Sequence, residues 1–251
     1  MMLSTMKSHT TVRKYTDEVI SDDVFHELVE AAQHAASSNF VQAYSIIQVK
    51  DEEKKKELGR LSRNEYQYST SALSLVFCAD LHRAKHAVEK HGETMKGGNL
   101  ENYTVATIDT ALFGQNFALA AESQGFGICY IGGVRNNPRE ISQLFDLPDH
   151  VIPLFGMTVG VPVKINEVKP RLPVQAIVHE DSYNSSKYEK QLEEYDNVTQ
   201  AYYRRRTKNR KDFTWSETMR DFLRVEKRSH LLNFVQSQGF LRSEKIDGSD
   251  E

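Results

Sequence analysis

Two short stretches of the sequence combine cations with other groups that bind anions. Residues 8–16 read SHTTVRKYT and place small hydroxyl side chains next to a histidine and two cations. Residues 169–173 read KPRLP and set Lys169 and Arg171 on either side of Pro170. Proline fixes φ, and residues i and i+2 of an extended segment point the same way, so both charges can face one anion. Because arginine binds phosphate with two parallel hydrogen bonds and lysine adds a point charge, these stretches predict a phosphate site, with a solvated loop as the alternative.

Two further stretches suit a flat or anionic ligand. Residues 130–133, YIGG, follow an apolar run, and paired glycines let backbone N–H groups approach a ligand closely. Residues 204–211, RRRTKNRK, hold six cations in eight positions. The aromatic residues that interleave with cations in single-strand nucleic-acid platforms are absent from this run, and the net charge of the chain is −3. A small anionic cofactor or a solvated turn is therefore favoured over nucleic acid.

Motifs for other chemistries are absent. GFGICYIGG has Tyr130 where a dinucleotide-binding motif needs its third glycine, and there is no P-loop, HExxH or GxSxG. His82 and His86 stand four residues apart, but no further metal ligand pairs with them, so a solvated helix face is favoured over a metal site. Cys129 lies in an apolar run, which favours a buried, inert thiol over a nucleophile.

Composition bounds the class of protein. No apolar run approaches the ~20 residues of a membrane span, and the first residues lack the apolar core of a signal peptide. The two cysteines provide no disulfide framework. The slightly negative net charge gives no general attraction to nucleic acid or to an anionic membrane. We therefore expect a cytoplasmic protein that binds neither.

The elements that must position these stretches follow from the hydrophobic pattern. Short apolar runs predict strands at residues 43–50, 72–80, 126–134 and 151–160. Helical spacing predicts helices at residues 21–36, 51–61, 81–92, 101–124, 137–145 and 187–206, and two more within 214–240. Ser21 is the expected N-cap of the first helix, and Gly125 the residue that ends the helix at 101–124. The mixture predicts an α+β layered fold with a helical C-terminal extension.

The helix at 101–124 is apolar on nearly every side. Between residues 102 and 124 its only charged residues are Asp109 and Glu122. A helix apolar all round is expected to be buried on several sides, which would suit an obligate subunit interface. The polar extension after residue 183 is either an ordinary surface helix pair or an arm that wraps a second subunit.

Several segments together resemble a known family. The segments are HTTVRKYT, AASSNFVQAYSII, AAESQGFGICYIGGVRNNP, LPDHVIPLFGMTVGVP, KPRLP, HEDSY and RRRTKNRKDFTWSE. In order and spacing they resemble the NADPH-dependent flavin/nitro oxidoreductases of the nitroreductase superfamily. The chain is most similar to the group with a long C-terminal extension, and to its Firmicute NADPH oxidoreductase branch. The resemblance covers residues 8–240, and its specificity comes from several motifs that match in order.

The resemblance implies a fold and an assembly. It implies an α+β nitroreductase-like fold with a central mixed or antiparallel sheet flanked by helices. Residues 1–180 would form the FMN-binding core, residues 181–242 a helical extension that wraps the partner subunit and carries the NADPH loop, and residues 243–251 a disordered tail. The protein would be a homodimer with FMN at the subunit interface.

The resemblance also implies an activity. NADPH would deliver hydride to N5 of FMN, and nitroaromatics, quinones or free flavins would then take the electrons in a ping-pong cycle. No catalytic side chain and no metal are expected, because the cofactor carries the chemistry while the protein supplies position and electrostatics. The alternative is a flavin-binding carrier or sensor without significant turnover.

Site residues follow by matching this sequence to the family's motifs. Lys169 and Arg171 would bind the FMN phosphate, Thr11 the phosphate or ribityl chain, and Arg13 the pyrimidine edge of the flavin. Thr10 stands where the family has an arginine, and Glu65 where it often has a glutamine. The implied FMN-binding residues are His9, Thr10, Thr11, Arg13, Ser37, Ser38, Glu65, Gln67, Tyr130, Gly132, Gly133, Lys169 and Arg171. The implied NADPH-binding residues are Arg206, Arg210 and Lys211.

Overall fold

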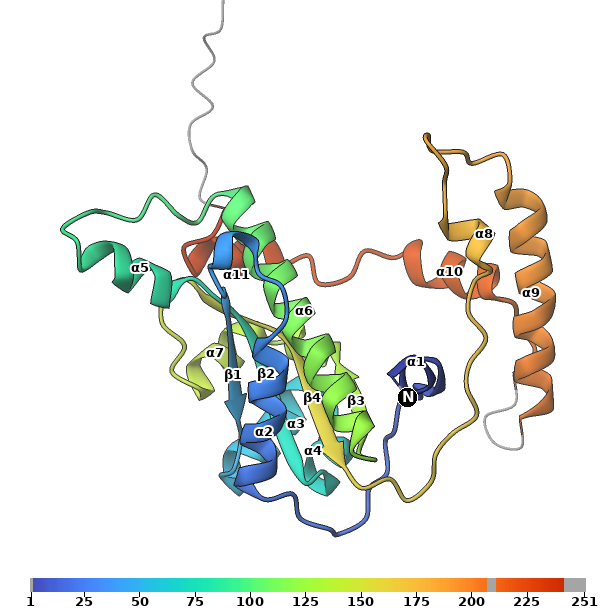
Figure 1. Ribbon diagram of the computed structural model, residues 1–251, viewed down its shortest axis with the longest axis horizontal. Helices are drawn as coiled ribbons and strands as arrows, with labels where there is room; N and C mark the ends of the chain where they lie inside the picture. Colours follow the sequence, from blue (N-terminus) through green and yellow to red (C-terminus); the bar gives the residue numbers. More distant parts are fainter. Residues whose placement is uncertain (1, 207–210, 242–251) are drawn as a thin grey trace, which may run out of the picture. The chain divides into compact units, whose positions relative to one another are not determined.

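The computed structural model describes residues 2–206 and 211–241 (Figure 1). The chain divides into two compact units, of which the second is Glu167–Lys227 and the first holds the residues before and after it. The predicted division after residue 180 and the predicted partner-wrapping arm stay predictions. The predicted disordered tail at residues 243–251 lies outside the described residues.

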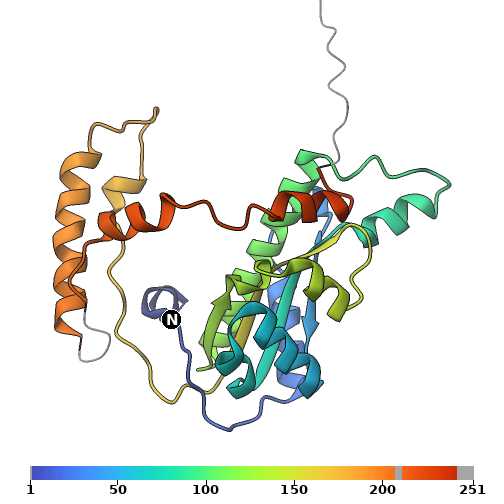
Figure 2. The same cartoon turned by 180° about the vertical axis from the view of Figure 1, so that it is seen from behind.

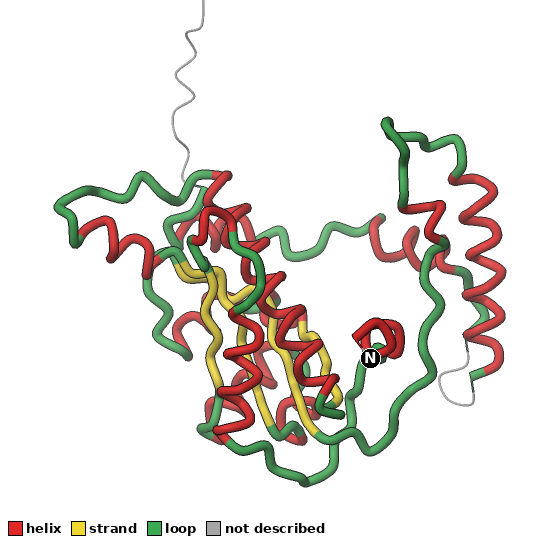
Figure 3. Tube along the Cα trace, in the orientation of Figure 1, coloured by secondary structure: helices red, strands yellow, loops and turns green. Residues whose placement is uncertain are grey.

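The first unit is built on an antiparallel sheet. In the part of the chain that the structure describes, this sheet has four strands in the order β1-β2-β4-β3. Its strands are drawn in yellow in Figure 3. The strands are β1 (Tyr44–Gln48), β2 (Leu73–Asp80), β3 (Gly127–Ile131) and β4 (Val151–Gly160). The inner strands β2 and β4 are buried along almost their whole length, because helices cover both faces of the sheet. All four predicted strands are confirmed, and the sheet is antiparallel rather than mixed.

Two layers of helices enclose the sheet. On one face lie α2 (Asp22–Gln33) and α6 (Leu100–Ser123), as Figure 1 shows. On the other face lie α3 (Glu52–Ser62), α4 (Glu65–Thr70) and α7 (Pro138–Leu144), seen from behind in Figure 2. Successive residues of β2 point to opposite faces, so Leu75 and Phe77 pack under α2 and α6, whereas Val76 and Cys78 pack under α3 and α4.

Local signals set the ends of the helices. The Ser21 hydroxyl accepts a hydrogen bond from the Val24 N–H at 3.3 Å and caps α2, as predicted. Asp51 caps α3 in the same way through the Lys54 N–H at 2.8 Å. Gly125 follows α6 with φ of +86°, a left-handed conformation that glycine adopts without strain. The predicted stop of α6 is therefore confirmed.

The first unit also contains shorter elements. They are α1 (Met2–Ser8), α5 (His82–Glu89), α11 (Leu231–Ser237) and the 3₁₀ helices η1 (Ser38–Phe40) and η2 (Gly132–Arg135). The sequence pattern did not predict α1 or α4. No residue of α1 is buried and α4 is only six residues long, so neither carries a readable hydrophobic period. Among the described helices, none is long and apolar enough to cross a membrane.

Helix α6 is buried on one side only within a single chain. Phe113 and Phe117 pack into the core beneath it. On its outer side, however, Ile108 remains 52% exposed and Leu112 remains 42% exposed. The prediction that this helix is buried on several sides is therefore wrong for one protomer, because an uncharged stripe of the helix faces outward.

The second unit is helical and has packing of its own. It contains α8 (Val174–Ile177), α9 (Tyr188–Arg205) and α10 (Trp215–Leu223). The Tyr195 ring of α9 meets the Trp215 ring edge-on at 5.8 Å, and Asp196 accepts a hydrogen bond from the Ser216 N–H at 2.9 Å. Aromatic rings thus supply the contacts that the pattern of aliphatic residues did not reveal.

Candidate cofactor site

The segment from His9 to Arg13 runs along the outer strand β3. The Val12 N–H donates to the Ile128 carbonyl oxygen at 2.9 Å, and the Val12 side chain is buried. A side chain on Gly127 would overlap that of Val12, so this glycine permits the close approach. With Val12 turned inward, Thr11 remains half-buried and Arg13 is exposed. Two of the predicted FMN residues are therefore available to a ligand at this edge.

Arg13 lies beside Cys129 of β3. Burial raises the pKa of the Cys129 thiol, and the nearby Arg13 guanidinium opposes that rise. Because burial dominates, Cys129 stays a protonated, inert thiol, as the sequence predicted. Arg13 therefore brings a positive charge to the strand end that leads into Tyr130 and the glycine pair.

His9 is held by one of the two charged residues in the apolar stretch of α6. Its Nδ1–H donates to the Glu122 carboxylate at 2.5 Å, and the Glu122 side chain is largely buried. His9 and Thr10 face a cavity of about 160 Å³. Its other polar lining residues are Thr5, Ser8 and Glu122. His9 and Thr10 thus contribute to one concave surface next to Thr11.

The glycine pair forms the start of η2. A side chain at Gly133 would overlap the Ser62 carbonyl oxygen and come within 2.6 Å of Asn64 Nδ2, so the backbone is pressed against the turn between α3 and α4. A side chain at Gly132 would meet only Arg135 Nη2, at 3.2 Å. The first N–H groups of a helix have no acceptor within it, so the amides of both glycines are suited to donate to a ligand.

Glu65 and Gln67 lie on α4, directly after the turn that packs against Gly133. Glu65 is exposed and Gln67 is half-buried. Glu65 also borders a cavity of about 310 Å³ lined by Lys55, Lys56 and other residues of α3 and α4. The turn between α3 and α4 therefore brings the start of α4 close to the glycine pair.

Tyr130 connects β3 to the middle of α6. Its hydroxyl donates to the Gly114 carbonyl oxygen at 2.9 Å, and its ring packs against Phe155 at 5.3 Å. Burial raises the pKa of the hydroxyl, with a further contribution from Glu122, so the group stays protonated and keeps donating. The ring remains 38% exposed and can border a ligand.

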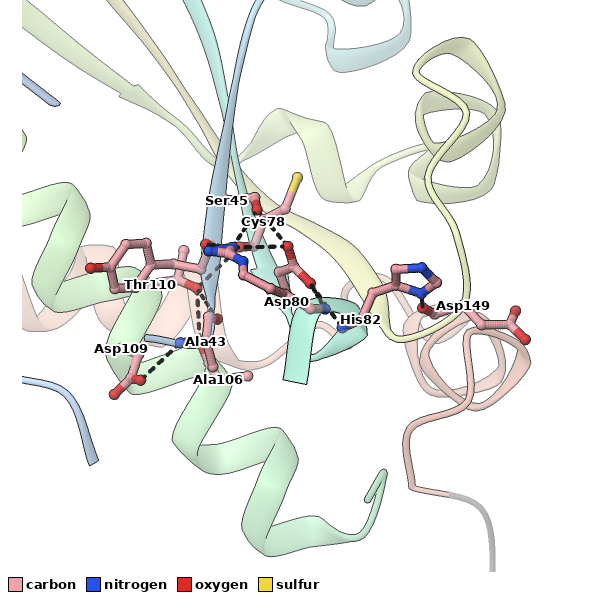
Figure 4. Close-up of polar contacts among 11 residues, drawn as sticks. Ala43, Ser45, Cys78, Asp80, His82, Ala106, Asp109, Thr110 and Asp149 are labelled. Carbon is pink, nitrogen blue, oxygen red and sulfur yellow. Dashed lines mark hydrogen bonds and ion pairs between the residues drawn. The ribbon is translucent and has the colours of Figure 1, made fainter. Parts of the chain in front are cut away.

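Ser37 and Ser38 are held by the other charged residue of α6, the buried Asp109. Its carboxylate accepts hydrogen bonds from Ser37 Oγ at 2.8 Å, from the Ser38 N–H at 3.1 Å and from the Ala43 N–H at 3.1 Å. Figure 4 shows Asp109 directed at Ala43 next to Thr110. The Thr110 hydroxyl donates to the Ala106 carbonyl oxygen at 2.7 Å and also lies near those of Cys78 and Ala43. The Ser37 hydroxyl is thus engaged within the chain, whereas the Ser38 side chain is exposed.

The loop that Asp109 holds has an unusual backbone. Asn39, Phe40 and Gln42 all have φ near +50°, a left-handed backbone conformation that residues other than glycine rarely adopt. The Phe40 ring is 80% exposed. A buried carboxylate that accepts backbone N–H groups at both ends of the loop can stabilise this conformation.

Replacing Asp109 with asparagine is expected to destabilise the fold. The amide group would point a donor at the Ser38 or Ala43 N–H, and each buried donor left without an acceptor costs about 1–3 kcal/mol. The melting temperature should fall by several degrees, and the amides of Ser38 and Ala43 should lose protection from hydrogen exchange. The matched control is Glu101→Gln, which removes the same charge from an exposed position of the same helix. Equal melting temperatures for the two variants would contradict this role of Asp109.

One chain does not bring all predicted FMN residues of the first unit together. His9 is held at Glu122 and the Ser37–Ser38 pair at Asp109, so the two anchors are thirteen residues, or about 20 Å, apart along α6. The segment 9–13, Tyr130, the glycine pair and α4 form one neighbourhood, connected through β3 and the α3–α4 turn. Ser37 and Ser38 are thus separated from His9, and Tyr130, anchored at Gly114, lies between the two anchors along α6.

Lys169 and Arg171 lie in the second unit on a segment held by α9. Tyr195 Oη donates to the Pro170 carbonyl oxygen at 2.9 Å, and Tyr202 Oη donates to that of Glu167 at 3.5 Å. Burial raises the pKa of Tyr195 and the charge of Arg171 lowers it, which reflects their proximity. Both cations are exposed, and within the described residues neither forms an ion pair. They are therefore free to bind an anion.

Two of the predicted NADPH residues, Arg206 and Lys211, lie among the described residues that follow α9. Arg206 follows the helix, with its guanidinium 5.8 Å from the Tyr202 ring centre and 6.0 Å from that of Tyr203. Lys211 lies 5.0 Å from the Phe213 ring centre. Arg210 is outside the described residues. The aromatic partners of these cations were missed at the sequence level, although the YYRRR run places two rings directly before the basic residues.

Comparison with models of protein families identifies the family to which the chain belongs. A model described as the nitroreductase family matches residues 6–161, and a model of the nitroreductase family C-terminal domain matches residues 169–243. The chain therefore belongs to the nitroreductase family and is a nitroreductase-type oxidoreductase. The group predicted from the sequence, with its C-terminal extension, is confirmed.

Individual relatives agree over nearly the full length. A Cr(VI) reductase of Pseudomonas sp. is 50% identical over 240 residues, with 96% of this chain and 99% of the relative covered. An FMN reductase (NADPH) of Bacillus subtilis is 40% identical over 242 residues, covering 95% and 97%. A nitroreductase structure from Bacillus subtilis has a TM-score of 0.92 at 40% identity, covering 96% and 99%. The α+β nitroreductase fold predicted from the sequence is thereby confirmed.

Proposed function

We propose that the protein is an FMN-dependent NADPH oxidoreductase of broad acceptor choice. The observation that carries the proposal is the pair Lys169 and Arg171. They are two exposed cations that have no acidic partner among the described residues, on a segment that tyrosines of α9 hold in place. A dianionic phosphate is the ligand such a pair fits best. The relative named FMN reductase (NADPH) supports the same cofactor and the same electron donor.

The residues of the first unit fit the remainder of FMN. The amides of Gly132 and Gly133 would donate to the edge of the flavin ring, and the Tyr130 ring would border it. Thr11 would contact the ribityl chain or phosphate. Arg13 would place its charge against the pyrimidine edge, where it favours added electrons. When bound, FMN would accept hydride from NADPH at N5 and pass electrons to nitroaromatics, quinones or free flavins.

The chain itself would bind and orient rather than transfer protons. No titratable side chain of the predicted site is needed as an acid or base, because the cofactor carries the hydride chemistry. Burial keeps the Tyr130 hydroxyl protonated and bonded to Gly114, so this ring would stay fixed during turnover. Membership of an oxidoreductase family favours this enzyme over the alternative of a flavin carrier or sensor.

Several features support a homodimer. The outer stripe of α6 that contains Ile108 and Leu112 is uncharged, and Phe40, in the loop that Asp109 holds, is exposed. Exposed apolar surface of this kind is typical of a subunit interface. A second copy would also account for the separation of Ser37 and Ser38 from His9. Both cysteines are free and buried, which supports a reducing cytoplasm.

Chromate is a second candidate acceptor. The relative named Cr(VI) reductase is 50% identical over nearly the whole chain. Chromate is a small oxyanion, and cations such as the exposed Arg13 and the half-buried Arg206 could attract it. Chromate-dependent oxidation of NADPH, compared with nitroaromatic, quinone and free-flavin acceptors at fixed NADPH, would rank the acceptor classes.

Arg206→Ala is expected to weaken the use of NADPH much more than that of NADH. The guanidinium would bind the 2′-phosphate that only NADPH carries, and a charge-assisted hydrogen bond is worth about 1.5–3 kcal/mol. The ratio of kcat/KM for the two donors should fall roughly 10- to 100-fold. Arg220→Ala, which removes an exposed arginine from α10 of the same unit, is the control. Equal losses with both donors would count against the assignment.

Steady-state kinetics test the proposed cycle as a whole. With NADPH and a quinone varied together, a ping-pong enzyme gives parallel lines in double-reciprocal plots. Lines that intersect would show that both substrates must be bound together, and would overturn the ping-pong proposal.

A further inference from the structure

We propose that the Tyr203 ring is a positioning residue shared by the FMN phosphate site and the NADPH phosphate site. The inference rests on the proposed function, in which Lys169 binds the first phosphate and Arg206 the second. In the structure, Lys169 Nζ lies 5.7 Å and Arg206 Cζ lies 6.0 Å from the centre of the same Tyr203 ring. Both distances fall within the ~6 Å range over which a cation is attracted to an aromatic face.

The ring is itself well fixed. Tyr203 lies in the last turn of α9, where its ring packs edge-on against Tyr202 and tilted against Phe213, each at 5.2 Å between centres. In the described part of the chain, the Tyr203 hydroxyl has no hydrogen-bond partner. The ring rather than the hydroxyl therefore makes the contacts of this side chain.

The contacts with the Tyr203 ring reduce the loss of side-chain entropy on ligand binding. Lysine and arginine side chains each lose rotamer freedom when they are fixed. Two like charges gathered near one point also repel each other, and the negative face of the ring offsets part of that repulsion. The ring would thus hold both cations near their working positions before either phosphate arrives.

Neighbouring aromatic residues do not have this property. Tyr202 contacts Arg205 and Arg206, but it is buried and its hydroxyl bonds the Glu167 carbonyl oxygen, so it serves the packing of the unit. Phe213 contacts Lys211 and no other predicted ligand-binding cation that the structure describes. Of the described aromatic side chains, Tyr203 alone contacts a predicted cation of each phosphate site.

The inference predicts that one substitution weakens two unrelated ligands. In Tyr203→Leu, FMN affinity and the NADPH-to-NADH ratio of kcat/KM should each fall about two- to five-fold, the range expected for a lost exposed cation–π contact. Tyr203→Phe keeps the ring and should retain both values. Tyr203→Met fills the space without a ring and should behave like the leucine variant, which guards against a folding defect specific to leucine.

The experiment measures FMN dissociation constants by flavin fluorescence and donor ratios by steady-state kinetics, with melting temperatures for each variant. Tyr183→Leu is the matched control, because it removes an exposed ring of the same unit that stacks on His179 and contacts no described lysine or arginine. Lys169→Ala should lower FMN affinity alone, and Arg206→Ala the donor ratio alone. Suppose that Lys169→Ala and Arg206→Ala have these effects, but that Tyr203→Leu and Tyr203→Met change neither FMN affinity nor the donor ratio, or only one of them. The shared role of the Tyr203 ring is then refuted, while the proposed function stands. If the two alanine variants have no effect, the phosphate sites themselves are wrong, and the inference is overturned with them.

Discussion

Lys169→Ala combined with Arg171→Ala is expected to yield protein that purifies without flavin. Both cations are exposed. Tyr195 and Tyr202 bond the backbone carbonyl oxygens of Pro170 and Glu167, and these contacts do not depend on the side chains at positions 169 and 171. The fold should therefore survive the change. Each charge-assisted contact to phosphate is worth about 1.5–3 kcal/mol, so losing both should weaken FMN binding roughly 100- to 10,000-fold.

The measurement is FMN occupancy after purification and the dissociation constant after reconstitution. Lys190→Ala combined with Arg220→Ala serves as the control, since it removes the same charge from exposed positions of the same unit. The control should keep its flavin. Full occupancy in the Lys169/Arg171 variant, or equal loss in the control, would show that the phosphate is bound elsewhere or by net charge alone.

Gly133→Ala is expected to disrupt the fold at the glycine pair, whereas Gly132→Ala is not. The added carbon at Gly133 would overlap the Ser62 carbonyl oxygen, which belongs to backbone and cannot turn aside. Forcing a methyl group into such a space costs about 1–3 kcal/mol. The loss should lower the melting temperature by several degrees in a chain of this size.

Gly132→Ala is the internal control for this prediction. Its added carbon would meet only the end of the Arg135 side chain, at 3.2 Å. Its melting temperature should stay close to that of the unaltered protein, but its affinity for FMN should fall, because the methyl group would stand between the backbone amide and the flavin. The two variants therefore separate packing from cofactor binding. Equal melting temperatures would contradict the contact described for Gly133.

The elements that were predictable have strong local signals. The inner strands β2 and β4 are nearly continuous apolar runs because helices cover both faces of the sheet. Helix α2 carries a hydrophobic period and an N-cap, and α6 is long, apolar on nearly every side and followed by a glycine. Helices α1 and α4 were not predictable, since one buries nothing and the other is a turn and a half long. Their positions depend on contacts with distant parts of the chain.

The types of residue in the candidate site were predictable, but the contacts that hold those residues in place were not. The isolated charges Asp109 and Glu122 were visible in the sequence, yet only the structure reveals that they hold the Ser37–Ser38 loop and His9. Likewise, nothing in the spacing of residues 169 and 203 predicts that Lys169 lies over the Tyr203 ring. Contacts between residues far apart in sequence arise from the fold, so local patterns do not contain them.

Anaerobic addition of NADPH to the purified protein tests the central proposal most directly. The protein should be yellow as isolated or after reconstitution with FMN. NADPH should bleach its visible flavin absorbance at lower concentrations than NADH does, and a quinone or nitroaromatic should then restore the colour. Protein that remains colourless with FMN, or a bound flavin that NADPH does not bleach, would contradict the proposed function.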